Sequence, residues 1–261
     1  MLYCDLPSGR FAYQLDGAQD APVLMLSNSL GTDYHMWDAQ APALQRHFRV
    51  LRCDGRGLGA SAVPPGPYTI EMLGRDTLAL LDALAIQQAH YCGLSLGGMV
   101  GMWLAVHVPE RIDRLALCNT AALMGPPRLW DTRIEGVRRE GLAAMSASIV
   151  ARWFTPSFFE REPAVAEAMR QMLARSPTEG YIACCEAIRD MDQRAILPRI
   201  RARTLVIAGS FDAAATPEDG RYLAETIPGA SYLELATAHL SNIEAPQPFT
   251  DALVRFFTRP G

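Results

Sequence analysis

Apolar residues in the first half of the chain come in short runs, separated by polar loops and one helical stretch. The first run alternates like an edge strand, and the uninterrupted runs predict strands buried on both faces of a sheet. The runs cover residues 10–16, 23–26, 48–53, 89–93 and 114–119. Residues 70–85 instead space their apolar side chains three and four positions apart, which is typical of an amphipathic helix. Strands that alternate with helices predict a mostly parallel sheet with helices on both faces.

The pattern changes between residues 123 and 196, where helical segments follow one another without a convincing strand. The patterns that resume afterwards are two strands and a last helix, at residues 203–209, 231–235 and 246–257. We therefore expect an α/β core made of residues 1–122 and 197–261. Residues 123–196 are expected to form an inserted helical cap over the carboxyl ends of the strands.

A length of 261 residues suits one large α/β domain, or a domain with one sizeable insertion. Apolar residues make up 49% of the chain, which is enough for a substantial core. No apolar run approaches the ~18 residues that a membrane span needs. The first residues also lack the basic and then apolar segments of a secretory signal. We therefore expect a cytoplasmic protein that does not associate with a membrane.

The ionisable residues exclude several kinds of chemistry. All 24 basic residues are arginines, which excludes phosphate binding by a Walker lysine as well as Schiff-base and pyridoxal chemistry. A net charge of −4 without a basic cluster argues against nucleic acid as a partner. The six cysteines form no C-x-x-C pair, which predicts buried free thiols rather than a metal or redox centre. We expect neither a metal nor a cofactor, and the sequence leaves the oligomeric state open.

The segment Gly93-Leu94-Ser95-Leu96-Gly97 matches the pattern G-x-S-x-G and joins a predicted strand to an apolar helix over residues 98–108. That strand–turn–helix context is what the motif requires of a serine nucleophile. The serine oxygen would stand above the sheet, beside a helix N-terminus whose N–H groups can stabilise an oxyanion. Ser95 is therefore the predicted nucleophile.

A serine nucleophile needs a base, and one of the five histidines lies in a suitable loop. His239 follows the last predicted strand, at the sheet edge where Ser95 is expected. The orienting acid should fall between serine and histidine in the chain, and Asp212 follows the preceding strand. Asp219 is the alternative acid, although its position favours the first turn of the next helix. The order Ser95, Asp212, His239 is that of a hydrolytic triad.

With these residues the chain resembles the α/β-hydrolase superfamily along its full length. Within it, the chain resembles the 3-oxoadipate enol-lactonases of the β-ketoadipate pathway, which degrades aromatic compounds. The motifs that carry this resemblance are Leu26-Ser27-Asn28-Ser29-Leu30-Gly31-Thr32, His35-Met36-Trp37-Asp38, Cys53-Asp54-Gly55-Arg56-Gly57, Gly93 to Gly98, Arg152-Trp153-Phe154 and Ala238-His239-Leu240-Ser241-Asn242-Ile243-Glu244. The Ser-Asn-Ser-Leu-Gly loop is the more particular one, because most relatives have His-Gly there. Leu58 departs from the family pattern, which usually has histidine at that position, but no triad role depends on it.

The resemblance implies an α/β-hydrolase fold and a serine hydrolase that opens 3-oxoadipate enol-lactone with water. The backbone N–H groups of Ser29 and Leu96 would form the oxyanion hole. His239 would remove the Ser95 proton and later activate water, while Asp212 fixes the imidazole. Direct attack by water, with His239 as its base, stays open at this point.

The implied substrate carries an acetate side chain, and a carboxylate in a partly closed pocket calls for an arginine. The predicted cap offers several arginines, of which Arg133 is the first choice because it lies beside Trp130 in the early cap segment. Trp153 would wall the lactone ring, although an aromatic side chain in the core of the cap is an equal interpretation.

Other functions share these features. A carbon–carbon bond hydrolase that acts on meta-cleavage products would use the same triad, and so would a cofactor-free, haloperoxidase-like carboxylesterase or perhydrolase. A hydrolase-fold receptor that binds a lactone with little or no turnover belongs to a different class. Haloalkane dehalogenases and epoxide hydrolases are disfavoured, because they place aspartate where Ser95 stands. Turnover of an activated ester separates the receptor from the enzymes.

Overall fold

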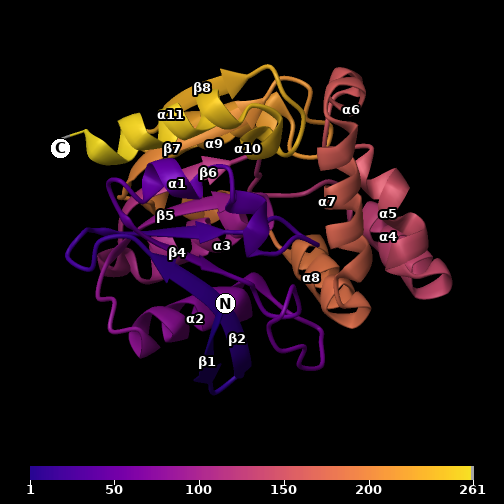
Figure 1. Cartoon of the computed structure of the whole chain (residues 1–261), viewed down its shortest axis with the longest axis horizontal. Coiled ribbons are helices and arrows are strands. Elements are labelled where there is room, and N and C mark those ends of the chain that lie inside the picture. The colour runs from indigo at the N-terminus through magenta and orange to yellow at the C-terminus, as the bar shows by residue number, and fades with distance from the viewer. Residues whose placement is uncertain (260–261) are drawn as a thin grey trace.

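Eight strands form one sheet through the centre of the molecule in the computed structural model, which describes residues 1–259 (Figure 1). In chain order they are β1 (Leu2–Leu6), β2 (Gly9–Asp16), β3 (Val23–Ser27), β4 (Arg49–Cys53), β5 (Ala89–Leu94), β6 (Ile112–Cys118), β7 (Arg203–Gly209) and β8 (Ser231–Leu235). Their order across the sheet is β1-β2-β4-β3-β5-β6-β7-β8. Because only the pairs that β2 makes with β1 and β4 are antiparallel, the prediction of a mostly parallel sheet is confirmed.

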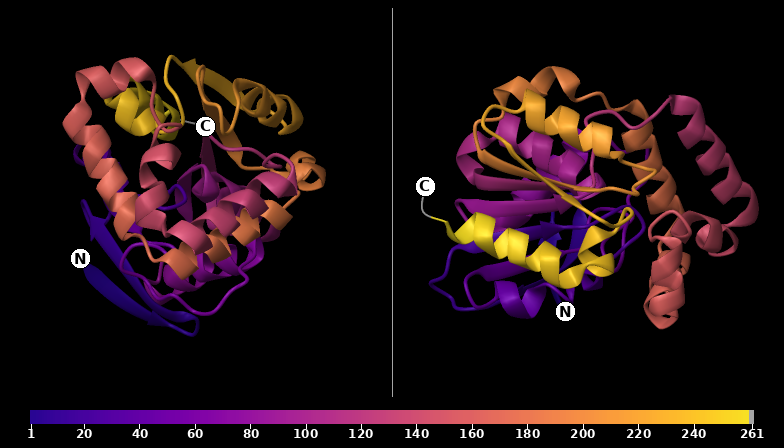
Figure 2. Two further views of the ribbon diagram at one scale, coloured as in Figure 1. Left: turned by 90° about the vertical axis from the view of Figure 1, so that its right-hand side faces the viewer. Right: turned by 90° about the horizontal axis from the view of Figure 1, so that it is seen from above.

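Helices cover both faces of the sheet, as Figure 2 shows most clearly in its right-hand view. On one face α1 (Ala41–Leu44) packs against α11 (Pro246–Thr258). On the other face α2 (Ile70–Ala83) packs against α3 (Leu96–His107), and α9 (Pro217–Thr226) packs on β7 and β8. Four short turns complete the core, namely η1 (Tyr34–Trp37), η2 (Pro109–Arg111), η3 (Arg194–Arg199) and α10 (Ser241–Glu244).

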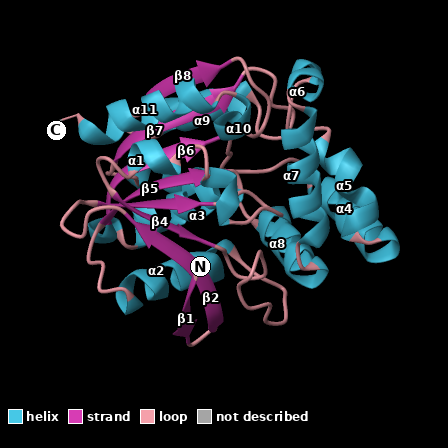
Figure 3. Cartoon of the chain, in the orientation of Figure 1, coloured by secondary structure: helices cyan, strands magenta, loops and turns pink. Residues whose placement is uncertain are grey.

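Five helices stand over the carboxyl ends of the parallel strands, and we call this group the cap (Figures 1 and 3). They are α4 (Pro127–Glu140), α5 (Leu142–Val150), α6 (Pro156–Arg161), α7 (Pro163–Arg175) and α8 (Thr178–Asp190). All five lie between β6 and β7 in the chain. Buried apolar side chains of the cap and of the sheet form one continuous cluster. The packing therefore does not separate the core from the cap. The boundaries expected for these two units, after residue 122 and after residue 196, stay a prediction.

The apolar pattern does not predict strand β1. Leu2 and Tyr3 are exposed, and only Leu6 is buried, so the segment shows neither alternation nor a continuous apolar run. Its backbone instead pairs with β2, from Leu2 opposite Tyr13 to Leu6 opposite Gly9. Hydrogen bonding to a neighbour, rather than burial, makes this segment a strand.

Within residues 1–259, the helices are all too short or too polar to cross a membrane. The same range contains no cluster of three or more side chains able to hold a metal ion. All six cysteines are free thiols, and five of them are buried. Burial raises the pKa of the Cys53 thiol to about 12, so this side chain stays protonated.

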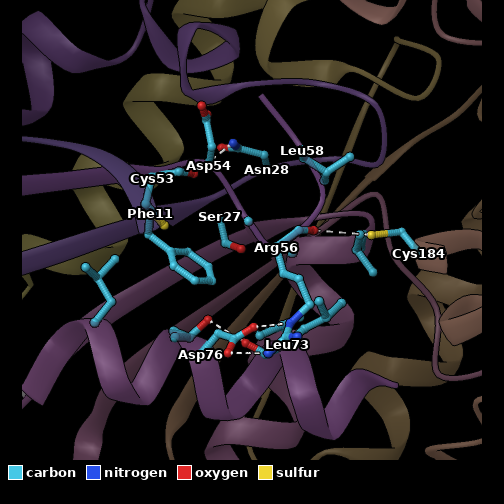
Figure 4. A pocket seen from close by; sticks show the side chains of 16 residues that line it. Phe11, Ser27, Asn28, Cys53, Asp54, Arg56, Leu58, Leu73, Asp76 and Cys184 are labelled. Carbon is cyan, nitrogen blue, oxygen red and sulfur yellow. Dashed lines mark hydrogen bonds and ion pairs between the residues drawn. The ribbon is translucent and has the colours of Figure 1, made fainter. Parts of the chain in front are cut away.

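A buried ion pair fastens the loop after β4 to α2. Arg56 Nε donates to Asp76 Oδ2 at 2.5 Å, and Arg56 Nη2 donates to Asp76 Oδ1 at 2.7 Å. Arg56 is 8% exposed and Asp76 6%. Both line a cavity between α2, α3 and the loop after β4 (Figure 4). The bound carboxylate raises the pKa of the Arg56 guanidinium, so this buried side chain keeps its positive charge.

Replacing Asp76 by alanine is expected to lower the free energy of unfolding by about 3–5 kcal/mol, because Arg56 would stay buried without a counter-charge. Urea unfolding followed by circular dichroism measures this loss. Glu71→Gln on the same helix is the matched control, since it removes an exposed pair with Arg75 and is expected to cost less than about 1 kcal/mol. Two equally small losses would contradict the role given to the buried pair.

Candidate active site

Ser95 stands on a sharp turn between β5 and α3. Its backbone has φ 55° and ψ −114°, in a region that residues other than glycine rarely adopt. The Ser95 N–H donates to Cys118 O at 2.9 Å, and Thr120 Oγ1 donates to Ser95 O at 2.7 Å. Hydrogen bonds to β6 and to the residues just after it therefore hold the strained turn in place.

The glycines of the motif let the turn pack closely. A Cβ atom on Gly93 would lie 2.2 Å from Gly97 O, and one on Gly97 would lie 2.3 Å from Ser27 O. Either contact is far inside van der Waals distance, so any larger residue would push α3 away from β3 and β5. The spacing G-x-S-x-G is thus a packing requirement of the turn that carries Ser95.

The structure brings Ser95, His239 and Asp212 together at the carboxyl edge of the sheet. His239 lies in the loop after β8, and its Nε2 is 3.0 Å from Ser95 Oγ. Asp212 lies in the loop after β7, and its Oδ2 is 2.8 Å from His239 Nδ1. Each of the three residues is at most 5% exposed. They come from distant parts of the chain because β5, β7 and β8 are parallel and end at one edge.

Asp212 is held in its ionised form. Its Oδ1 accepts from the N–H groups of Ala214 at 2.8 Å and Ala215 at 3.1 Å, and its Oδ2 also accepts from Asn119 Nδ2 at 3.2 Å. Burial alone would raise the pKa of Asp212, but attraction to His239 and these hydrogen bonds hold it below its usual value. Asn119 is a site residue that the sequence analysis missed. Its place directly after β6, at the same sheet edge, is the signal that points to it.

The predicted oxyanion donors are Leu96, directly after Ser95 in the chain, and Ser29. Leu96 opens α3, and the first N–H groups of a helix have no partner within it. Ser29 follows β3 and lines the same pocket as Ser95. Its N–H donates to Met36 Sδ at 3.3 Å, and a thioether is a weak acceptor. The oxyanion role of these two N–H groups stays a prediction.

The loop that carries Ser29 is fixed by its neighbour Asn28, seen in Figure 4. Asn28 O accepts from Gly97 N–H at 3.0 Å, which ties the loop to the start of α3. The Asn28 side chain donates to Cys53 O at 2.9 Å and accepts from Trp37 Nε1 at 3.0 Å. This asparagine therefore sets the distance between the Ser29 loop and the Ser95 turn.

A pocket lies above Ser95 and His239, between the sheet edge and the cap. Its remaining lining residues are Ser29, Leu30, Met124, Trp130, Arg133, Ile149, Arg152, Trp153, Tyr181, Ile188 and Ala214. The Arg133 guanidinium lies 5.2 Å from the centroid of the Trp130 ring. Trp153 lines the pocket and is only 6% exposed. Its side chain therefore both forms part of the pocket wall and belongs to the buried core of the cap.

Arg133 and Arg152 bring positive charge to the pocket. Neither Arg133 nor Arg152 forms an ion pair with a carboxylate in the part of the chain that the structure describes. Burial and the charge of Arg133 lower the pKa of the Arg152 guanidinium, so the two cations repel each other. The Tyr181 hydroxyl is buried in the same lining, beside the Arg133 guanidinium and the Cys185 thiol. These groups would accept an anionic ligand.

Known proteins resemble this chain over nearly its whole length. Residues 22–246 match the family model for the alpha/beta hydrolase fold. The chain is 44% identical to 3-oxoadipate enol-lactonase 2 of Acinetobacter baylyi, over 92% of this chain and 90% of that protein. It is 34% identical to the putative carbamate hydrolase RutD of Pseudomonas syringae, over 92% and 95%. The crystal structure of the enol-lactonase from Burkholderia xenovorans LB400 matches with a TM-score of 0.97 at 47% identity, covering 99% of this chain and 100% of that one.

Proposed function

The chain belongs to the α/β-hydrolase family, and on that premise we propose that it opens 3-oxoadipate enol-lactone with water to give 3-oxoadipate. It is a carboxylic ester hydrolase, as its enol-lactonase relatives are named. The observation that carries the proposal is the hydrogen-bonded line Ser95–His239–Asp212 beneath a pocket lined by two arginines. Ester chemistry and an acidic substrate both follow from that arrangement.

Ser95 is the proposed nucleophile. Its hydroxyl gives its proton to His239 Nε2 while the oxygen attacks the lactone carbonyl, and Asp212 stabilises the imidazolium that forms. The negative oxygen of the tetrahedral intermediate is stabilised by the Leu96 and Ser29 N–H groups, the latter exchanging a weak sulfur acceptor for a charged one. Collapse of the intermediate breaks the ring C–O bond. The enolate leaves, takes the proton that His239 had received from Ser95 and becomes the ketone, which returns His239 to its neutral form.

Water completes the reaction on the acyl-enzyme. His239 takes a proton from water, and the hydroxide attacks the Ser95 ester. Collapse then breaks the bond to Ser95 Oγ and returns a proton to it. The product is a free acid with a second carboxylate. The 3.0 Å contact between His239 Nε2 and Ser95 Oγ favours this covalent route over direct attack by water.

Arg133 is the proposed partner of the substrate carboxylate, with Trp153 as the wall of the ring site. Arg152 also lines the pocket and is exposed to solvent. The Tyr181 hydroxyl is a further donor in the same lining. A carboxylate held by arginine and tyrosine would stand beside Ser95, which fits a lactone with an acetate arm.

Arg133→Ala is expected to raise KM for the enol-lactone about 10- to 100-fold, because a hydrogen bond to a charged group contributes about 1.5–3 kcal/mol. Hydrolysis of p-nitrophenyl acetate, which has no carboxylate arm, should stay near the wild-type rate. Steady-state kinetics on both substrates measures the difference. Arg138→Ala serves as the control, since Arg138 is an exposed cap arginine that pairs with Glu186. Equal losses on both substrates would indicate damage to the cap instead of lost recognition.

Disappearance of 3-oxoadipate enol-lactone, followed by ultraviolet absorbance against the spontaneous rate, tests the function directly. We expect rapid loss of the lactone. Activity confined to neutral esters would overturn the proposed substrate and favour a carboxylesterase. Tight lactone binding without turnover of either substrate would indicate a receptor.

A further inference from the structure

Glu244 ends the motif that begins with His239, and the proposed reaction gives it no part. It closes α10, is 8% exposed, and uses both carboxylate oxygens. Oε2 accepts from the N–H of Ala238, the residue before His239, at 2.8 Å. Oε1 accepts from the Thr155 N–H at 3.1 Å and from the Thr155 hydroxyl. One carboxylate thus joins the histidine loop to a cap segment 89 positions away in the chain.

The same cap segment, residues 152–155 between α5 and α6, makes further bonds to the active-site loops. The N–H of Leu240, the residue after His239, donates to Trp153 O at 3.0 Å. Arg152 Nη2 donates to the carbonyl of Ala213, next to Asp212, at 3.0 Å. The residues on either side of His239 are therefore both fixed by hydrogen bonds that lead to the cap. The side chain of Trp153, in the middle of the segment, lines the pocket.

We propose that Glu244 is a positioning residue for His239, and that it sets the base by tying its loop to the segment that walls the pocket. The inference rests on the triad of the proposed function. Hydrogen bonds from N–H groups to an ionised carboxylate are about twice as strong as neutral ones. A displacement of about 1 Å at a catalytic group can cost about 100-fold in rate. The cap segment and His239 consequently move as one unit. A substrate held by the cap therefore binds with His239 already correctly positioned.

Substitutions at the two ends of the link have distinct consequences. Glu244→Gln keeps the size of the side chain but offers one oxygen and one NH2 group, so one of the two ends loses its acceptor. Thr155→Val removes only the hydroxyl donor and keeps the Thr155 N–H bond. The two changes act on one link in series, and their effects should not add.

The experiment measures kcat and KM for p-nitrophenyl acetate, with active sites counted by titration with a fluorophosphonate so that only competent molecules enter kcat. We expect Glu244→Gln to lower kcat per titrated site about 10- to 100-fold with KM within twofold, and Thr155→Val to lower kcat about threefold. The double variant should be no slower than Glu244→Gln alone. Matched controls on the cap are Glu186→Gln and Thr132→Val, which change an ion pair with Arg138 and a bond to Arg128 O. Both controls should stay within twofold.

A thermal melt is run beside the kinetics. If Glu244→Gln lowers the melting temperature while kcat per titrated site is unchanged, Glu244 is a structural anchor only and the inference is overturned. Additive losses in the double variant would overturn it as well. The ester assay needs the triad but not the lactone. If the enol-lactone proves not to be the substrate, this result still stands, so an error in the proposed function can be distinguished from an error in the role of Glu244.

Discussion

Replacing Ser95 by alanine is expected to lower kcat by roughly a million-fold while the fold survives, because serine, histidine and aspartate act as one unit in such triads. Alanine keeps a Cβ atom on the turn and removes only the oxygen that lies 3.0 Å from His239 Nε2. The remaining N–H groups and the pocket would give slow hydrolysis at best. Initial rates on the enol-lactone and on p-nitrophenyl acetate measure the loss.

Ser210→Ala is the matched control, since Ser210 is an exposed serine in the loop after β7 whose hydroxyl bonds to Glu234 at 2.9 Å. It should hydrolyse both substrates at the wild-type rate. Near-normal activity in Ser95→Ala would refute Ser95 as the nucleophile and return the mechanism to direct attack by water. A circular dichroism spectrum equal to that of the wild type shows that the variant is folded.

Asp212→Asn is expected to lower kcat by about 10⁴-fold, the loss typical of a triad whose acid becomes an amide. The amide has nearly the shape of the carboxylate, but it cannot offset the positive charge on His239 and can hold the imidazole in the wrong tautomer. The low pKa of Asp212 means that this charge is present throughout the neutral range. Steady-state kinetics at pH 7 on the enol-lactone and on an activated ester measures the effect.

Asp219→Asn tests the alternative acid at the same time. Asp219 forms a capping box with Thr216 at the start of α9. The Asp219→Asn variant should have a free energy of unfolding about 0.5–2 kcal/mol lower, as expected for the loss of a helix cap, and an unchanged kcat. If the kinetic losses at positions 212 and 219 were reversed, the acid would have been assigned to the wrong loop.

Much of this molecule follows from local patterns. Buried strands such as residues 23–26 are recognisable in the sequence as continuous apolar runs because both faces of the sheet are covered. The turn at Ser95 is recognisable because its close packing requires glycine at fixed positions. Asp212 and His239 could be chosen because parallel strands end at one edge, which turns the loops after β7 and β8 into neighbours.

What the sequence could not predict depends on contacts between distant segments. Thr155 and Glu244 are 89 positions apart, and neither position shows in its own surroundings that the two meet. Tyr181 has the helical spacing of a core aromatic, and only the structure reveals that it lines the pocket beside Arg133. The sulfur contact of the Ser29 N–H is equally invisible, because it depends on how Met36 folds back from η1. Strand β1 was missed because it has almost no buried face.

The order of the triad residues along the chain also determines when the reaction becomes possible during synthesis. Ser95 is made early, on β5, but the acid and base follow β7 and β8 and leave the ribosome only after the whole cap. A nascent chain that ends before residue 239 carries a serine on its turn without a base to take its proton. Hydrolysis can therefore begin only once the eighth strand has taken its place at the sheet edge.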